Sequence, residues 1–181
     1  YFRRERPRRR SNETVRWPSG VRLVSLAEMP PKAANDLLWE TLQATYEDTL
    51  DCPGLCGVRT REDVLEAHRS VGEYDPSWWF VLMKDERPAG CLLLSRCETQ
   101  QSTELVYIGV AKWARGLGFA RGMLSFGISL VAGREFRSLA CAVDLGNTPA
   151  VKLYMAHKFR QFASRTALIC QLPLAGVAMG G

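Results

Sequence analysis

Apolar and polar residues follow two different spacings along the chain, and together these predict strands and helices in alternation. Short, mainly apolar runs predict seven strands, at residues 21–28, 78–84, 91–97, 104–110, 138–144, 159–165 and 166–172. Apolar residues at helical spacing predict helices over 33–46 and about 116–131, the second with Leu117, Ala120, Leu124, Ile128 and Val131 on one face. The expected order is therefore β-α-α-β-β-β-α-β-α-β-β.

Capping residues predict where the two remaining helices begin. Thr60 is followed three positions later by Asp63, which resembles a capping box and predicts a helix from Thr60 to about Arg69. Asn147, Thr148 and Pro149 predict the start of a short helix, because Asn caps well and Pro loses little at the first helical position.

The order of elements predicts a mixed α/β (α+β) fold. Strands that follow one another directly pair antiparallel, whereas strand–helix–strand units imply parallel neighbours. We expect a mostly antiparallel sheet of about seven strands with about four helices, in which the fourth and fifth strands (104–110 and 138–144) are parallel. Residues 16–172 then form a single domain, between a basic, flexible arm at 1–15 and a flexible tail at 173–181.

The net charge of +5 is concentrated at one end of the chain. The first ten residues contain six arginines and one glutamate, so they carry the whole excess, and the remaining residues are neutral overall. Such a run is typical of a solvated arm, and a nucleic-acid partner is disfavoured beyond that arm. The start has no apolar stretch of the kind that a secretory signal contains, and no apolar run approaches the roughly 18 residues of a membrane span.

Six cysteines, at positions 52, 56, 91, 97, 141 and 170, leave disulfides formally open. Three of them lie in apolar strand-like runs, where cysteine acts as a small hydrophobic residue, so reduced thiols and a cytoplasmic location are expected. The paired C-x-x-C spacing of a zinc site is absent, and His68 and His157 are the only histidines, so no metal is expected.

The stretch "VAKWARGLGFARGM" (110–123) places glycines and arginines between a strand and a helix, a combination that favours phosphate binding. A nucleotide-hydrolase P-loop is excluded, because no Gly-Lys pair is present. A dinucleotide fingerprint is disfavoured, because Arg121 stands where the third glycine belongs and the preceding strand is not the first.

The same stretch resembles the [QR]-x-x-G-x-[GA] signature of the GNAT family of acyl-CoA-dependent acyltransferases. Arg115, Gly118 and Ala120 occupy its three fixed positions, and "NTPAVKLYMAHKF" (147–159) is similar to the family's second signature. Lys112 replaces the usual Pro after the strand, and Lys158 replaces the usual Gly before Phe159. The element order also matches over about residues 21–172.

This resemblance implies that acetyl-CoA binds, as co-substrate, between a splayed fourth and fifth strand. Its pantetheine arm would pair with Ile108, Gly109 and Val110, where Gly109 suits either a close approach or a bulge. Its pyrophosphate would lie on the backbone of residues Arg115, Gly116, Leu117, Gly118, Phe119 and Ala120, with charge from Arg115 and Arg121. Asn147 would contact the pantetheine arm, cap a helix, or do both, and the arginines could equally be solvated.

The resemblance also implies catalytic roles for two side chains. Tyr154 would donate a proton to the departing thiolate, and a core tyrosine is the alternative. Glu104, early in the fourth strand, would accept the amine proton, often through water, and a surface glutamate at a strand end is the alternative.

These inferences predict an N-acyltransferase that moves an acetyl or other short acyl group from acyl-CoA to a primary amine by direct attack in a ternary complex. A non-catalytic acyl-CoA sensor is the alternative function. The acceptor, a small molecule or a peptide, would meet the loop at 46–57, where Glu47, Asp48 and Asp51 could attract a cationic amine. The acceptor pocket could also be lined by Trp78, Trp79 and Trp113, for which a place in the core or at its rim is the alternative. A homodimer is compatible with the sequence.

Overall fold

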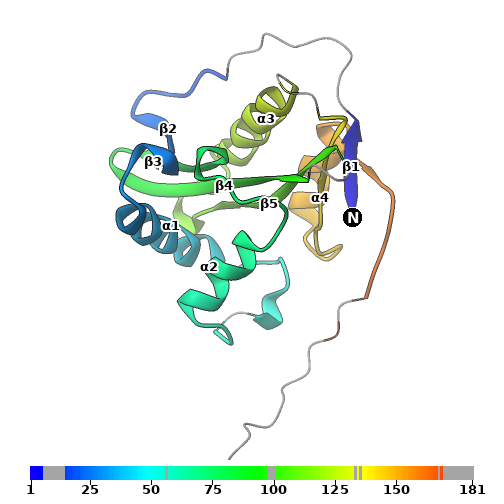
Figure 1. The fold of residues 1–181 in the computed structure, drawn as a ribbon, viewed down its shortest axis with the longest axis horizontal. Helices are drawn as coiled ribbons and strands as arrows, with labels where there is room; N and C mark the ends of the chain where they lie inside the picture. Colours follow the sequence, from blue (N-terminus) through cyan, green and yellow to red (C-terminus); the bar gives the residue numbers. More distant parts are fainter. Residues whose placement is uncertain are drawn as a thin grey trace, which may run out of the picture.

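A seven-stranded sheet with helices on both faces forms the frame of the molecule (Figure 1). The structure is a computed structural model and describes residues 1–5, 15–55, 57–97, 101–132, 134, 136–166 and 168. The strands are β1 (Phe2–Glu5), β2 (Val21–Ser25), β3 (Trp79–Lys84), β4 (Arg87–Cys97), β5 (Ser102–Val110), β6 (Ser138–Cys141) and β7 (Arg160–Gln161). The helices are α1 (Pro31–Tyr46), α2 (Arg61–Arg69), α3 (Phe119–Ala132) and α4 (Thr148–Ala156).

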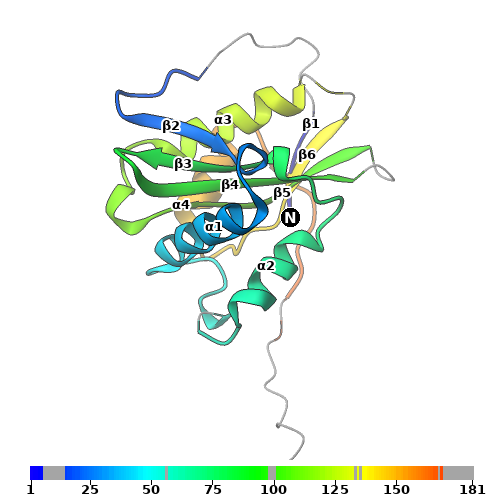
Figure 2. The same ribbon diagram turned by 60° about the vertical axis from the view of Figure 1, so that its left-hand side comes forward.

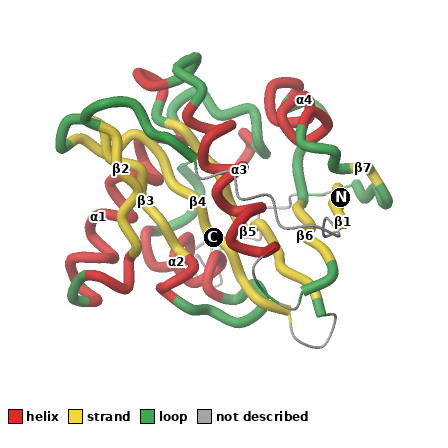
Figure 3. The backbone as a smooth tube through the Cα atoms, turned by 90° about the horizontal axis from the view of Figure 1, so that it is seen from above, coloured by secondary structure: helices red, strands yellow, loops and turns green. Residues whose placement is uncertain are grey.

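The sheet has the order β2-β3-β4-β5-β6-β1-β7 (Figure 3), and every neighbouring pair is antiparallel except β5 and β6. Figure 2 shows α1 and α2 on one face and α3 on the other. The predicted mixed fold, with its parallel pair of strands, is confirmed.

The core lies along β3 and β4, whose side chains are buried on both faces. Trp79 is fully buried, and its indole N–H donates to the carbonyl of Leu94 at 3.1 Å. On the opposite face, Gly127 of α3 packs against Leu92, where an added Cβ would lie 3.3 Å from the leucine side chain. α1 and α3 each contact β4, from opposite faces of the sheet.

The parallel pair separates part-way along its length. β5 and β6 pair only from Ser102 with Ser138 to Leu105 with Cys141, so residues 106–110 of β5 have no partner on β6. A bulge begins at this point, because Leu93 faces Tyr107 while Leu94 faces Leu105, which leaves Val106 as the additional residue. The two strands therefore splay, as predicted, and over residues 106–110 the edge of β5 that faces away from β4 has no neighbouring strand.

The capping residues predict the starts of α2 and α4 correctly, whereas α3 begins at Phe119, three residues after the expected start. Thr60 and Asp63 make the reciprocal bonds of a capping box at the start of α2. Asn147 caps α4, where its side-chain oxygen accepts from the N–H of Ala150 at 3.2 Å. The connection between the strands expected at 78–84 and 91–97 is only two residues long, because Asp85 and Glu86 turn the chain with positive φ and β4 already begins at Arg87.

The expected flexible arm is wrong at its very start, because residues 2–5 form β1 between β6 and β7. Phe2 is only 3% exposed and packs against Tyr154, with 6.4 Å between the ring centroids. The physical reason is that β6 otherwise offers an open edge, and a short basic strand with one inward phenylalanine can complete it. Residues 6–14 of the predicted arm lie outside the described residues.

Several other predictions meet the limits of the described chain. Outside the described residues lie most of the strand expected at 166–172, the tail at 173–181, Cys56 and Cys170. The strand expected at 159–165 is shorter and spans only Arg160–Gln161. Cys52, Cys91, Cys97 and Cys141 are free thiols. A search of the described helices finds no segment long and apolar enough to cross a membrane.

Candidate active site

The gap between the splayed strands is a cleft of about 580 Å³, called here the β5–β6 cleft. Its walls are residues 105–110 of β5, the turn before α3, the first turn of α3, and one face of α4. The cleft thereby collects most of the predicted site residues: Ile108, Gly109, Val110, Arg115, Gly116, Gly118, Phe119, Ala120, Arg121, Asn147 and Tyr154.

The turn before α3 presents backbone N–H groups to this cleft. Gly116 and Gly118 have φ values of +82° and +80°, which other residues rarely adopt. A Cβ added at either glycine would meet nothing within 4 Å, so the protein itself leaves the space above the turn open. The first bond of the helical ladder runs from the Gly122 N–H to the Gly118 carbonyl, so the N–H groups of residues 119–121 have no partner in the helix. The turn is thus suited to an anion.

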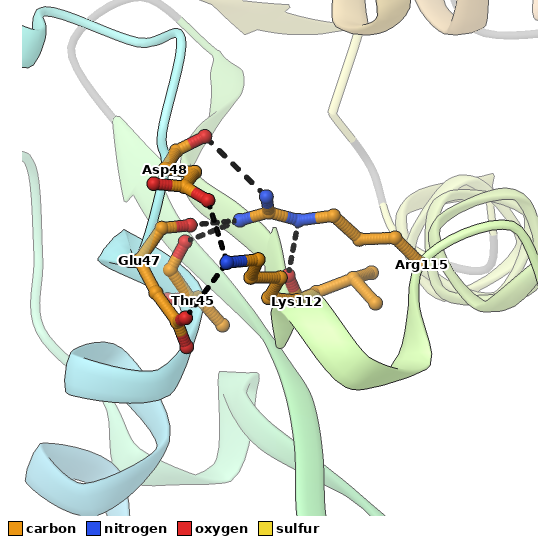
Figure 4. A network of polar contacts seen from close by, with 6 residues as sticks. Thr45, Glu47, Asp48, Lys112 and Arg115 are labelled. Carbon is orange, nitrogen blue, oxygen red and sulfur yellow. Dashed lines mark hydrogen bonds and ion pairs between the residues drawn. The ribbon is translucent and has the colours of Figure 1, made fainter.

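The two arginines of this stretch have different partners. Arg115 donates to four backbone carbonyls, those of Val110, Thr45, Glu47 and Asp48, at 2.6–3.3 Å (Figure 4). Its guanidinium therefore closes the C-terminal end of α1, and its contact with a phosphate stays a prediction. Arg121 is exposed and lines the cleft, and within the described residues it makes no hydrogen bond or ion pair.

Lys112 strengthens the same connection. Its ammonium lies 3.0 Å from Glu47 and 2.8 Å from Asp48, and it holds the pKa of the Asp48 carboxyl below its usual range (Figure 4). Lys112 and Arg115 together attach the loop after α1 to the turn before α3. Two of the three acids expected to attract an amine are consequently occupied by Lys112.

Tyr154 lines the cleft from α4 and is buried, with 4% of its surface exposed. Burial, assisted by the negative charges possible at Cys141 and Asp51, raises its pKa well above 10. The rings of Phe2 and Phe159 lie at centroid distances of 6.4 and 5.5 Å from its ring. The phenol is therefore protonated at neutral pH and firmly positioned.

Two predicted site residues lie apart from the cleft. Leu117 is 58% exposed and does not line it. Glu104 lies where β5 is still paired with β6, opposite Ala140, and lines neither cavity described here, although burial raises its pKa. Gly109 does line the cleft, but the bulge is at Val106, and the missing Cβ of Gly109 leaves room for Tyr107 and Thr45.

A second cavity of about 500 Å³ lies on the other side of β5, between α1, α2 and the loop that joins them, and is called here the α1–α2 cavity. Its walls include Trp39, Tyr46, Asp51, Arg59, His68 and Tyr107. Four residues, Thr49, Asp51, Val106 and Tyr107, line both cavities, so the two meet at the bulge of β5. The expected tryptophans are elsewhere: Trp78 and Trp79 are buried in the core, and Trp113 is stacked by Arg87 at 4.4 Å.

The family model described as the acetyltransferase (GNAT) family matches residues 38–159, about two thirds of the chain. The chain belongs to the GNAT family. The match runs from α1 to Phe159, so this GNAT domain contains both cavities and the turn before α3.

Individual relatives agree with this assignment. A mycothiol acetyltransferase from Thermomonospora curvata is 29% identical over 107 residues, which cover 59% of this chain and 35% of that protein. A GCN5-related N-acetyltransferase from Sphaerobacter thermophilus superposes with a TM-score of 0.64 at 16% identity, over 88% of this chain and 46% of that one. A diaminobutyrate acetyltransferase from Paenibacillus lautus, in complex with L-2,4-diaminobutyric acid and coenzyme A, gives 0.55 at 15%, over 76% and 74%. The GNAT chain thus spans about a third of the curated relative.

Tyr107 and Arg59 line the α1–α2 cavity, but no motif in the sequence marks either of them as a site residue. Tyr107 lies within an apolar strand, between Val106 and Ile108, and Arg59 lies in a loop close to other charged residues. Asp51 was noted only as one of three acids. The available signal was the GNAT resemblance itself, which points to the loop before α2 as the acceptor side without saying which of its side chains face inward.

Proposed function

We propose that the chain transfers an acetyl or other short acyl group from acyl-CoA to a primary amine, by direct attack while both substrates are bound. The observation that carries the proposal is the meeting of two cavities at the bulge of β5. One cavity ends at a glycine turn suited to a pyrophosphate, and the other opens on the opposite side of the same strand. A donor and an acceptor can therefore reach the same point from two sides.

The β5–β6 cleft fits coenzyme A on its own features. The N–H groups at the start of α3 and the cation of Arg121 suit the pyrophosphate, and the unpaired backbone of residues 106–109 suits the amide groups of the pantetheine arm. Acyl-CoA, when bound, supplies a thioester whose carbonyl carbon the amine attacks. Among the relatives, the diaminobutyrate enzyme with coenzyme A and an amine substrate supports this pairing.

Tyr154 is the proposed acid. As the new C–N bond forms and the C–S bond breaks, the sulfur needs a proton, and the Tyr154 hydroxyl holds one at neutral pH. Its phenolate is then reprotonated from solvent. The same burial that raises the pKa of Tyr154 also disfavours a thiolate in the cleft, so the transfer is not strongly uphill.

Two carboxylates are candidates for the base that takes a proton from the amine. Glu104, proposed from the family resemblance, lines neither cavity and would need a water chain. Asp51 lines both cavities, so a bound amine can reach it directly. We therefore favour Asp51, and a larger loss of kcat in Asp51→Asn than in Glu104→Gln would support this choice.

Binding of acetyl-CoA tests the first requirement of the proposal, that the chain binds the acyl donor. At 100 times its Kd, acetyl-CoA stabilises the folded chain by about 2.7 kcal/mol, which raises Tm by roughly 5–10 °C in a domain of this size. ATP, which has phosphates but no pantetheine arm, is the control and is expected to give a smaller shift. No shift with millimolar acetyl-CoA would overturn the proposal.

Release of free thiol from acetyl-CoA in the presence of an amine panel then separates an enzyme from a sensor. An enzyme releases thiol in proportion to acetylated amine, and a sensor shows the thermal shift alone. Tyr154, which has a clear chemical role only in turnover, is the feature that favours the enzyme.

A further inference from the structure

The α1–α2 cavity contains a positive charge for which the described residues provide no partner. The Nε atom of Arg59 is buried and makes no hydrogen bond. Among the described residues, the guanidinium also has no ion pair. Native proteins seldom leave a buried polar group unsatisfied, because its desolvation is then uncompensated. Arg59 lines the cavity, so a ligand bound there can provide the missing partner.

Neighbouring arginines behave differently. Arg61, two residues later, pairs with Asp36 at 2.5 Å. Arg69 donates to Asn35 at 2.6 Å and stacks on Tyr74. Neither lines the α1–α2 cavity. The side chain without a partner is therefore the one that faces this cavity.

Asp51 provides the opposite charge, at the end of the cavity nearest the donor. Its Oδ1 accepts a hydrogen bond from the N–H of Asp144 at 2.9 Å, which fixes the carboxylate between the loop after α1 and the loop before α4. It lines both cavities, and its charge contributes to the raised pKa values of Tyr154 and Cys52. An ammonium bound at Asp51 is thus close to the proposed reaction point.

The other polar groups around the cavity are neutral. His68 has its pKa lowered to about 4, by burial and then by the charge of Arg59, so it is uncharged at pH 7. Tyr46 is bonded to His68 at 3.0 Å, and Tyr107 to Thr45 at 3.0 Å. Within the described residues, the wall therefore carries one negative and one positive charge, with aromatic rings around them.

From this arrangement we infer that the acceptor is a small amino carboxylate, whose amine lies at Asp51 and whose carboxylate pairs with Arg59. The inference rests on the proposed acyl transfer, which makes the α1–α2 cavity the acceptor site. A cavity of about 500 Å³ suits an amino acid or a molecule of similar size. A planar carboxylate also matches the fork of an arginine, which can donate two parallel hydrogen bonds.

The test compares amino acids with the amines that lack only the carboxylate. Leucine with isoamylamine, phenylalanine with phenethylamine, and lysine with cadaverine form three pairs, and O-phosphoethanolamine asks whether a phosphate is preferred instead. Calorimetry on the full chain saturated with coenzyme A measures binding without turnover. Thiol release from acetyl-CoA is measured separately with the same amines.

We expect at least one amino acid to bind about 10- to 100-fold more tightly than its decarboxylated partner, the range for one charge-assisted contact. Arg59→Gln should remove that preference and leave the affinity for the plain amine within about twofold. Arg61→Gln, a matched loss of charge in the same region but outside the cavity, should keep the preference.

The inference is overturned if no amino acid binds more tightly than its partner amine, if Arg59→Gln keeps the preference, or if O-phosphoethanolamine is bound best. Its failure is distinct from failure of the proposed function. Thiol release with plain amines and no carboxylate preference would leave the transferase intact. Arg59-dependent binding of amino acids without any thiol release would show an amino-carboxylate site in this cavity but remove the transferase, and with it the acceptor role.

Discussion

The two cavities that meet at the bulge of β5 are built from different parts of the chain. The β5–β6 cleft is formed largely by backbone: an unpaired strand edge, a turn with two positive-φ glycines, and the first turn of a helix. The α1–α2 cavity is formed by side chains from two helices and a loop, among them Trp39, Arg59 and His68. Backbone geometry that suits one cofactor can be shared by many enzymes, whereas a wall of side chains can change with each acceptor.

The connection between the two cavities is also specific. Arg115 belongs to the glycine-rich turn by sequence, yet its side chain holds the end of α1 through three of its four carbonyl contacts. The loop that borders the α1–α2 cavity is thereby attached to the turn before α3. A change at Arg115 should therefore affect both regions, and a change at Arg121 only one.

The largest expected effect concerns the chemistry where the cavities meet. Tyr154→Phe removes the proposed proton donor and should lower kcat by about 100-fold or more, with acetyl-CoA affinity nearly unchanged. Steady-state kinetics together with calorimetry measure both quantities. Unaltered kcat would remove Tyr154 from the acid role.

Tyr107→Phe is the matched control, because it deletes the hydroxyl of a second, partly buried tyrosine in the same cleft. That hydroxyl is already bonded to Thr45, so we expect a loss of about 1 kcal/mol of stability and a fall in kcat of less than about tenfold.

The next effect separates the two arginines. Arg115→Gln loses charge-assisted bonds to backbone carbonyls and should lower the free energy of unfolding by about 2 kcal/mol. Arg121→Gln should change stability by less than about 0.5 kcal/mol, but weaken acetyl-CoA binding about fivefold. Urea unfolding and calorimetry distinguish the two outcomes. Equal free energies of unfolding for the two variants would contradict the different roles of Arg115 and Arg121.

The last comparison is between two glycines, one from each cavity, whose replacement has a small expected effect on stability. Gly118 has φ +80° and Gly57 has φ +73°, and a Cβ at either position would meet nothing within 4 Å. Alanine at either site should therefore cost about 1 kcal/mol of stability, through backbone strain alone. Acetyl-CoA affinity should fall about tenfold for Gly118→Ala and stay constant for Gly57→Ala, as measured by calorimetry. Equal affinities in the two variants would count against a pyrophosphate at the turn.

Much of the fold could be predicted because its signals are local. The capping pair Thr60 and Asp63, the cap at Asn147 and the glycines before α3 each constrain the backbone within a few residues, so their sequence is enough. The site was predictable to the same extent, since the cleft residues follow from that turn and its strand. Arg115 and Arg121 could not be told apart, because their partners lie elsewhere in the chain.

The sequence by itself determined the order of the elements from β2 to β7, the caps of α2 and α4, and the turn that faces the β5–β6 cleft. Only the tertiary structure decided that residues 2–5 complete the sheet and that Phe2 packs on Tyr154. It alone also decided that Asp51 and Arg59 face one cavity. Caps and glycine turns act between near neighbours in the chain, whereas an open strand edge or an unpaired charge finds its partner across the fold, at a distance that no local pattern encodes.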